Sequence, residues 1–249
     1  MLVRSMEPHA PRLERRAASV EARVLPANPR LVGHLASPLI EEEYRTLGAT
    51  LHRAGERSGI RSLVVTSALP QEGKTLSAAN IALVLSRYFG RRVLAIDADL
   101  RKPALHELFG IERGPGLCDA LGSGAAAQPV QVQPRLWVMP AGKQQVEPAR
   151  VLTSDDMRRL LAEASKEFDW VVIDTPPAGV LPDAQLLTAI ADGVILVVRA
   201  GKTPYDICRR AAAAVSDNGK LLGVLLTRGA TRRPASYYAS YGKASRARE

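Results

Sequence analysis

Aromatic residues, cysteines and long apolar runs are all scarce in this sequence. Phenylalanine, tryptophan and tyrosine make up 4% of the 249 residues, so the hydrophobic core must consist mainly of Leu, Val, Ala and Ile. The two cysteines, Cys118 and Cys208, lie far apart and form no Cys-x-x-Cys pair. Their spacing argues against a disulfide framework and a cysteine zinc site, and it fits a reducing cytoplasm.

Segments that would take the chain into or across a membrane are also lacking. No apolar run approaches the ~20 residues that cross a bilayer. Arginines and glutamates occupy the N-terminus, where a signal peptide would need an apolar segment. We therefore expect a soluble protein that stays inside the cell.

Positive charge, in contrast, is abundant. The formal net charge is +9, and much of the excess lies at the two ends of the chain. Such charge suits phosphate-rich or anionic-membrane surroundings, although basic ends are also commonly just solvated, flexible segments. The sequence has no recognition helix and no interleaving of aromatic and basic residues, so we predict no nucleic-acid partner.

Residues 68–75 read Ala-Leu-Pro-Gln-Glu-Gly-Lys-Thr and lie between an apolar run, residues 63–65, and a helix-like segment, residues 76–88. Strand, Gly-Lys-Thr loop and helix is the context that a phosphate-binding P-loop requires. Backbone N–H groups of such a loop converge on phosphate oxygens, and the helix adds its positive N-terminal end. Lys74 would bridge the outer phosphates, and Thr75 would offer its hydroxyl to Mg²⁺. An ordinary strand-to-helix turn is the alternative for this motif alone.

Two further apolar strands end in aspartates. Residues 93–99 read Val-Leu-Ala-Ile-Asp-Ala-Asp, which places Asp97 and Asp99 on the same side of the strand end. Residues 170–177 read Trp-Val-Val-Ile-Asp-Thr-Pro-Pro, and Asp174 has the Walker B pattern of a carboxylate that holds Mg²⁺ through water. Each aspartate could instead cap the next helix. Because ligands bind beyond the carboxyl ends of parallel strands, the three motifs together predict one nucleotide site.

The rest of the chain alternates apolar strands with helical segments. This alternation predicts an α/β fold with a doubly wound, mainly parallel sheet and helices on both faces. The length suits one domain, which we place at residues 37–228. A disordered basic leader, residues 1–36, would precede it, and a flexible basic tail, residues 229–249, would follow it. Within the domain we expect a mobile loop at residues 122–133 and a helix capped by Thr203.

The tail contains half of the six tyrosines, namely Tyr237, Tyr238 and Tyr241. These residues lie beyond the last predicted strand, outside any core that the pattern defines. One interpretation is an apolar patch packed on the domain. The other is a phosphate-accepting segment, because a tethered tyrosine reaches a nearby active site at high effective concentration.

These motifs together resemble those of the bacterial tyrosine kinases, or BY-kinases, the CpsD/CapB-type enzymes of capsule and exopolysaccharide synthesis. The P-loop, the paired aspartates followed by Leu-Arg-Lys-Pro, and the Ile-Asp-Thr-Pro-Pro strand end carry the resemblance, which runs from about Ser37 to the C-terminus. It implies a P-loop NTPase fold related to MinD and ParA proteins. It also implies an autokinase that uses ATP and Mg²⁺ to phosphorylate its own C-terminal tyrosine cluster and thereby regulates polysaccharide synthesis and export.

The resemblance also implies roles for individual residues. Catalysis would involve Lys74, Asp97, Asp99 and Asp174, with Asp97 as the candidate base for the tyrosine hydroxyl and Asp99 as the alternative. Mg²⁺ would be held by Thr75 and, through water, by Asp99 or Asp174. The nucleotide would contact Gln71, Glu72, Gly73, Lys74, Thr75 and Leu76. The phosphate acceptors would be Tyr237, Tyr238 and Tyr241.

Partners follow from the same resemblance. Residues 40–51 have the spacing of an amphipathic helix, where the family carries Glu-x-x-Arg-x-x-Arg for docking on a neighbouring subunit in a ring. Glu42 and Arg45 match this motif, whereas Gly48 replaces the second arginine. Kinases of this type without a membrane segment are activated by the cytoplasmic part of a membrane polysaccharide co-polymerase. The resemblance thus implies a homo-oligomer, such an activator and a peripheral position at the inner face of the cell membrane.

Two other functions compete with this interpretation. One is a MinD/ParA-like switch that hydrolyses ATP without phosphorylating protein, and the other is a non-catalytic, nucleotide-binding scaffold. Leu69 occupies the place of the extra signature lysine of MinD and ParA proteins, and this absence argues against the switch, as does the tyrosine tail. The intact P-loop lysine and strand-end aspartates argue against the scaffold, although Gln71 stands where the family often has glycine.

Overall fold

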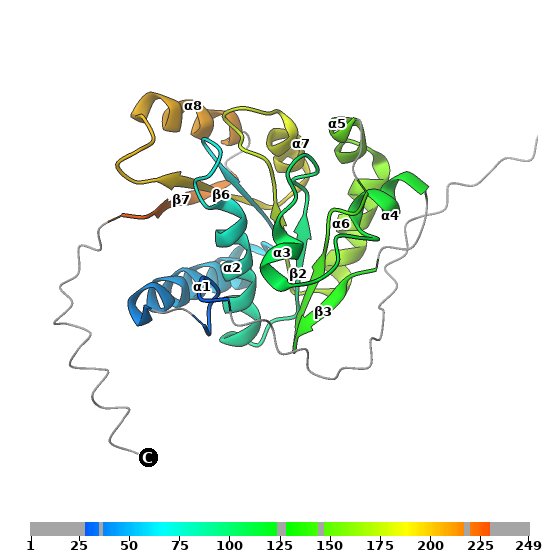
Figure 1. Cartoon of the computed structure of the whole chain (residues 1–249), viewed down its shortest axis with the longest axis horizontal. Coiled ribbons are helices and arrows are strands. Elements are labelled where there is room, and N and C mark those ends of the chain that lie inside the picture. The colour runs from blue at the N-terminus through cyan, green and yellow to red at the C-terminus, as the bar shows by residue number, and fades with distance from the viewer. Residues whose placement is uncertain (1–27, 35–36, 124–127, 144–146, 217–219, 230–249) are drawn as a thin grey trace, which may run out of the picture.

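The computed structural model describes residues 28–34, 37–123, 128–143, 147–216 and 220–229 (Figure 1). Seven strands of this part form one sheet in the order β3-β4-β2-β5-β1-β6-β7. Neighbouring strands are parallel except for β3 and β4, which are antiparallel. The strands are β1 (Ser62–Ser67), β2 (Val93–Asp97), β3 (Val130–Gln133), β4 (Leu136–Met139), β5 (Trp170–Asp174), β6 (Gly193–Arg199) and β7 (Leu221–Thr227).

Helices cover both faces of this sheet (Figure 1). The face formed by α1, α2 and α3 carries one hydrophobic cluster, and the face formed by α4 to α8 carries the others. No helix among the described residues is long and apolar enough to cross a membrane. The helices are α1 (Pro38–Ser58), α2 (Lys74–Arg87), α3 (Leu105–Phe109), α4 (Leu117–Ser123), α5 (Pro148–Leu152), α6 (Asp155–Glu167), α7 (Asp183–Ile190) and α8 (Tyr205–Val215).

The central strands are buried on both faces, as the continuous apolar runs predict. In β2, Val93 and Ala95 pack into the cluster on the α2 side, whereas Leu94 and Ile96 pack into the cluster on the α6 side. This alternation follows from the two-residue period of a strand. Because β1, β2 and β5 are parallel, their carboxyl ends lie at one edge of the sheet, where their polar terminal residues meet.

The predicted doubly wound, mainly parallel sheet is confirmed, but one strand was missed. Residues 122–133 were expected to form a mobile loop, whereas the structure places β3 at the end of that range, antiparallel to β4. The reason is the partner: Val132 becomes buried only when β3 lies against β4. A four-residue strand with two valines has too little pattern of its own to be recognised without that neighbour.

The predicted disordered leader is wrong for residues 28–34, which the structure describes as a folded turn. Leu31 and Val32 are fully buried in the cluster on the α2 side. Asn80 of α2 holds the turn in place: its Oδ1 accepts a hydrogen bond from Val32 N at 2.8 Å, and its Nδ2 donates to Arg30 O at 3.0 Å. The remaining residues of the predicted leader lie outside the described part of the chain.

The helix predicted at residues 40–51 is confirmed and extends over the whole of α1. Gly48 lies buried where α1 crosses α2, and a Cβ at this position would lie 2.1 Å from Val84 Cγ1. Glycine therefore allows the two helices to approach closely, and its conformational cost is offset by this contact. Glu42 and Arg45 are exposed on α1, where Arg45 Nη1 lies 3.2 Å from Glu42 Oε2.

Candidate active site

The P-loop connects β1 directly to α2, as its sequence predicts. Gly73 has φ +95°, in the left-handed region, and α2 begins at the next residue, Lys74. Gln71 also has a positive φ, of 62°. A side chain in this conformation costs roughly 1–2 kcal/mol, which explains why glycine would suit the position of Gln71 better. The loop nevertheless adopts the turn that starts a helix with its amide groups free to bind an anion.

Glu72 supports the loop from behind. Its buried carboxylate accepts hydrogen bonds from Leu69 N at 2.8 Å, from Arg199 N at 3.4 Å and from the Thr203 hydroxyl. Its carbonyl oxygen accepts a hydrogen bond from Thr227 Oγ1 at 2.7 Å. The side chain thus fastens the P-loop to the end of β6 and to Thr203, and the backbone carbonyl fastens it to the end of β7. The backbone N–H of Glu72 is the group left to contact a nucleotide.

Thr203 was predicted to cap a helix, and this prediction is wrong. The helix α8 begins at Tyr205, with Pro204 as the preceding residue and no side-chain cap. The Thr203 hydroxyl instead bonds to Glu72 and to the carbonyl of Arg199. A buried carboxylate from a loop distant in sequence competes successfully for the hydroxyl, because an acid in the interior requires hydrogen-bond donors.

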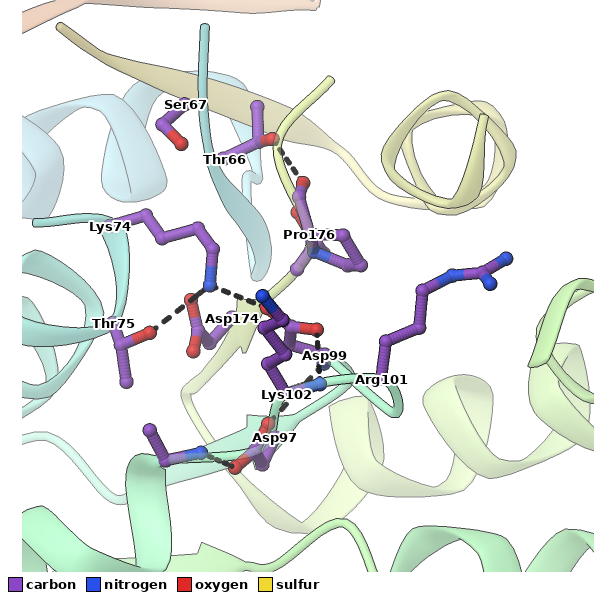
Figure 2. Close-up of polar contacts among 12 residues, drawn as sticks. Thr66, Ser67, Lys74, Thr75, Asp97, Asp99, Arg101, Lys102, Asp174 and Pro176 are labelled. Atoms are coloured by element: carbon purple, nitrogen blue, oxygen red, sulfur yellow. Dashed lines mark hydrogen bonds and ion pairs between the residues drawn. The ribbon is translucent and has the colours of Figure 1, made fainter. Parts of the chain in front are cut away.

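Lys74 lies between two of the predicted carboxylates (Figure 2). Its Nζ is 2.7 Å from Asp99 Oδ2 and 3.7 Å from Asp174 Oδ1, and it donates to Thr75 Oγ1 at 3.2 Å. Burial alone would lower the pKa of Lys74, but the charges of Asp174 and Asp99 outweigh it and raise the pKa above its usual value. A permanent positive charge therefore stands at the start of α2, as phosphoryl transfer requires.

Asp97 accepts the most backbone hydrogen bonds of the three aspartates in the described part of the chain. Its Oδ2 accepts hydrogen bonds from Ala104 N at 3.0 Å and Leu105 N at 2.9 Å, and its Oδ1 accepts one from Asp99 N at 3.3 Å. Burial raises the pKa of Asp97 above its usual range, and the nearby charge of Asp174 raises it further. The carboxylate therefore holds the start of α3 in place, while Oδ1 keeps only one long contact.

Asp174 supplies the clearest test of whether these residues suit a metal ion. It is fully buried at the end of β5, and neither carboxylate oxygen has a hydrogen-bond partner among the described residues. Burial raises the pKa of Asp174, and the charge of Lys74 opposes this effect. Buried carboxylate oxygens are normally satisfied by donors, water or ions. Asp174 thus keeps acceptor capacity that a hydrated Mg²⁺ ion could use, with the Lys74 ammonium 3.7 Å from its Oδ1.

A Mg²⁺ site built partly from substrate fits this arrangement. No group of three or more His, Cys, Asp or Glu side chains is placed to hold a metal by itself in the described ranges. Mg²⁺ in phosphoryl-transfer sites typically keeps several waters and binds one or two carboxylates together with substrate phosphates. Thr75, Asp99 and Asp174 offer one hydroxyl and two carboxylates at the same strand edge, so the residues fit that mode.

An ion pair that sequence reasoning did not single out flanks the site. Arg101 Nε lies 2.9 Å from Asp183 Oδ2, and the buried Asp183 carboxylate opens α7. Close by, Lys102 N donates to Asp99 Oδ1 at 3.0 Å. These contacts tie the loop after β2 to the segment after β5. The Leu-Arg-Lys-Pro motif contains Arg101, but its partner on α7 has no local sequence signal.

The predicted site residues do not all meet at this edge. Lys74, Thr75, Asp97, Asp99 and Asp174 are brought together (Figure 2). The side chain of Leu76 packs against the hydrophobic cluster on the α2 side, so its backbone is the part that could contact a nucleotide. The predicted oligomerisation residues of α1 are elsewhere, and the tyrosines at positions 237, 238 and 241 lie outside the described residues.

Comparisons with known proteins agree with this geometry. A family model described as cellulose biosynthesis protein BcsQ matches residues 60–222. The tyrosine-protein kinase YwqD of Bacillus subtilis is 38% identical over 208 residues, which cover 82% of this chain and 87% of YwqD. This chain belongs to the bacterial tyrosine kinase family, the CpsD/CapB-type tyrosine autokinases of capsule and exopolysaccharide biosynthesis.

Solved structures confirm the α/β P-loop NTPase fold of this kinase. The chimerical protein CapA2B2 matches with a TM-score of 0.75 and 29% identity, covering 81% of this chain and 91% of that chain. The cobyrinic acid a,c-diamide synthase of Mycobacterium smegmatis, solved with bound ADP and magnesium, matches with a TM-score of 0.57 and 25% identity over 75% of this chain and 81% of that chain.

Proposed function

We propose that this kinase transfers the γ-phosphoryl group of Mg-ATP to tyrosines of its own C-terminal segment, Tyr237, Tyr238 and Tyr241. The observation that carries the proposal is the position of Lys74, a buried cation between Asp99 and Asp174 at the start of the P-loop helix. A cation there neutralises charge on a transferred phosphoryl group, as it does in other P-loop enzymes.

The transfer forms one bond to phosphorus and breaks another. The phenolic oxygen of the tyrosine forms a bond to the γ-phosphorus, and the bond from that phosphorus to the bridging oxygen breaks. ADP leaves with the electron pair, and the phenolic proton passes to a carboxylate of the site. Because an unperturbed tyrosine has a pKa of about 10, this proton needs an acceptor near neutral pH.

Mg²⁺ would be held by Thr75 and, through water, by Asp99 or Asp174, and it would supply charge neutralisation and orientation of the phosphates. The chain's own contribution is positional. The amides from Gly73 to Thr75 face the phosphates, and Lys74 is held in place by Asp99. Glu72 prevents the loop from moving, because it links the loop to β6 and β7.

Asp97 is the better candidate for the base. Asp99 is in direct contact with the Lys74 ammonium at 2.7 Å, so its carboxylate is already engaged in an ion pair. Asp97 makes no ion pair within 4.0 Å in the described part of the chain, and its Oδ1 has only the 3.3 Å contact with Asp99 N. Asp99 remains the alternative, and substitution of each residue separates the two roles.

The variant Asp97→Asn is expected to lower the single-turnover rate of tyrosine phosphorylation by about 10²–10³-fold, because the amide cannot accept the proton. Affinity for Mg-ATP, measured by titration calorimetry, is expected to change by no more than a few-fold. In Asp99→Asn the affinity itself is expected to fall, since Lys74 loses its partner. A normal rate in Asp97→Asn, with a lost rate but normal affinity in Asp99→Asn, would make Asp99 the base.

Phosphosite mapping tests the proposed acceptors. Purified protein is incubated with Mg-ATP, with and without a candidate activator peptide, and phosphate is located by mass spectrometry. We expect phosphate on Tyr237, Tyr238 or Tyr241 and its complete loss when all three are replaced by Phe. The matched control is Tyr205→Phe, since Tyr205 is highly exposed on α8. Phosphate that appears on Tyr205, or ATP hydrolysis without any phosphotyrosine, would contradict the proposal.

We propose in addition that a membrane-bound polysaccharide co-polymerase activates this kinase through its cytoplasmic part, and that the kinase binds peripherally at the inner face of the membrane as a homo-oligomer. Three observations support this: the family, the absence of a membrane-crossing helix among the described residues, and the net charge of +9. Anionic lipids attract such basic segments. Full phosphorylation by purified protein without any partner would refute the need for an activator.

A further inference from the structure

The strand β7 forms an open edge of the sheet (Figure 1). Within the described residues it pairs with β6 alone, so its other backbone edge has no strand partner. It contains neither proline nor charge, and three of its side chains are exposed: Leu222 by 38%, Val224 by 47% and Leu226 by 62%. Soluble proteins usually protect such an edge with charges, proline or a covering segment.

The exposed side chains of Val224 and Leu226 lie on one face, because they alternate along the regular part of the strand, whereas Leu222 lies at an irregularity where residues 221–223 face Val194 and Ile195 of β6. Val224 pairs with Leu196 of β6, and Leu226 pairs with Val198. Those two β6 residues are buried under α8. The helix therefore covers this face over β6 and leaves the same face of β7 bare. We call the exposed residues Val224 and Leu226 the β7 strip.

We propose that residues 237–241 of the same chain add to this edge as an antiparallel strand and cover the β7 strip with tyrosine rings. The segment reads Tyr-Tyr-Ala-Ser-Tyr, and tyrosine is among the residues that favour strands. In an extended conformation Tyr237 and Tyr241 fall on one face, and Tyr238 falls on the other. Aromatic rings beside aliphatic side chains form favourable cross-strand pairs.

Chain connectivity favours this occupant over any other molecule. The segment follows β7 directly, and Arg228 has φ 55°, a left-handed conformation that turns the chain at the end of the strand. Residues 228–236 span up to about 30 Å when extended, whereas neighbouring strands are about 5 Å apart. A hairpin is therefore well within reach. The short tether also gives the segment a millimolar effective concentration at the edge.

Docking would affect which tyrosines are available as substrates, and this consequence rests on the proposed function. A tyrosine held at the edge of the sheet cannot enter an active site, so the docked segment is the protected form. A phosphate adds a charge of about −1.5 to −2 to the side chain, which is unfavourable beside Val224 and Leu226. Phosphorylation is therefore expected to keep the segment away from the β7 strip.

Hydrogen–deuterium exchange of the full chain tests the docking itself. Phosphatase-treated protein is used without nucleotide, so that the result does not depend on kinase activity. We expect amides of residues 237–241 to exchange at least ten-fold more slowly than in Val224→Asp, and more slowly than in Tyr237→Ser/Tyr241→Ser. The second variant alters only the tail, so its effect cannot come from misfolding of β7. Ile40→Asp, an equally exposed apolar site on α1, is the control and is expected to leave this protection unchanged.

The dependence on protein concentration identifies the occupant. Protection that is constant across a hundred-fold dilution supports pairing within one chain. Protection of β7 that decreases on dilution would show that a second copy occupies the edge, and this would overturn the proposal. Exchange of residues 237–241 at the rate of an unstructured peptide would also overturn it. Because no ATP is present, a failure of tyrosine phosphorylation in the earlier test would leave this result unaffected.

Discussion

Replacement of Lys74 with methionine is expected to lower the rate of tail phosphorylation by about 10²–10³-fold, the usual effect of removing one preorganised charge from a transition state. Methionine keeps most of the side-chain volume and removes only the ammonium. The loop amides and the start of α2 remain, so nucleotide affinity is expected to weaken much less than the rate. Single-turnover phosphorylation and nucleotide titration on the same preparation measure the two effects separately.

The same substitution is also expected to lower stability, because Lys74 neutralises a cluster of acids. Asp99 Oδ2 lies 2.7 Å from its Nζ and Asp174 Oδ1 lies 3.7 Å away. Loss of one partner of a buried ion pair commonly costs about 3–5 kcal/mol. Millimolar Mg²⁺ is expected to raise the Tm of Lys74→Met more than that of the natural protein, since the ion would replace the missing positive charge.

Lys102→Met provides the matched control. Lys102 is exposed on the loop after β2, and the contact that it makes with Asp99 uses its backbone N–H, which the substitution preserves. Its rate and Tm are expected to stay close to those of the natural protein. Equal losses in the two variants would show that the overall charge of this edge matters, and they would contradict a specific role for the Lys74 ammonium.

The assembly of the site could be predicted from sequence because each residue is placed by its own strand or loop. Asp97 and Asp174 end apolar strands, and Lys74 follows a glycine at the start of a helix. In a parallel sheet these positions necessarily share an edge. The sequence did not show how the residues are held: Glu72 bonds to Arg199 and Thr203, more than a hundred residues away. Such pairings leave no periodic signal.

The errors in the predicted fold have the same origin. The turn at residues 28–34 follows a stretch rich in proline and arginine, and this part of the sequence has no helical or alternating period. Leu31 and Val32 are nevertheless buried against α2. The strand β3 is likewise defined by β4 alone. Gly48 stood out in the sequence because it replaces an arginine of the family motif, whereas in the structure it lies at a close crossing point of α1 and α2. Tertiary contacts override local propensity in each case.

The substitution Leu31→Ala is expected to lower the free energy of unfolding by about 2–5 kcal/mol, the range for removing a buried leucine side chain. Leu31 is fully buried although it precedes the first helix, so the effect would show that the domain begins before residue 37. Urea unfolding measures it as a lower midpoint with an unchanged slope. Ile40→Ala, at a residue 43% exposed on α1, is the control and is expected to change stability by less than about 0.5 kcal/mol.

Asn80→Ala extends the argument from the apolar contact to the hydrogen bonds. The Asn80 side chain accepts a hydrogen bond from Val32 N at 2.8 Å and donates one to Arg30 O at 3.0 Å. The substitution would leave the buried N–H of Val32 unsatisfied, at a cost of about 1–3 kcal/mol. If the turn docks as one unit, the losses from Leu31→Ala and Asn80→Ala are expected to sum to more than the loss in the double variant, because either change alone releases the turn. Strict additivity would show that the two contacts act independently and not as one docked unit, whereas a loss below about 0.5 kcal/mol for Leu31→Ala would mean that the turn contributes little to the stability of the domain.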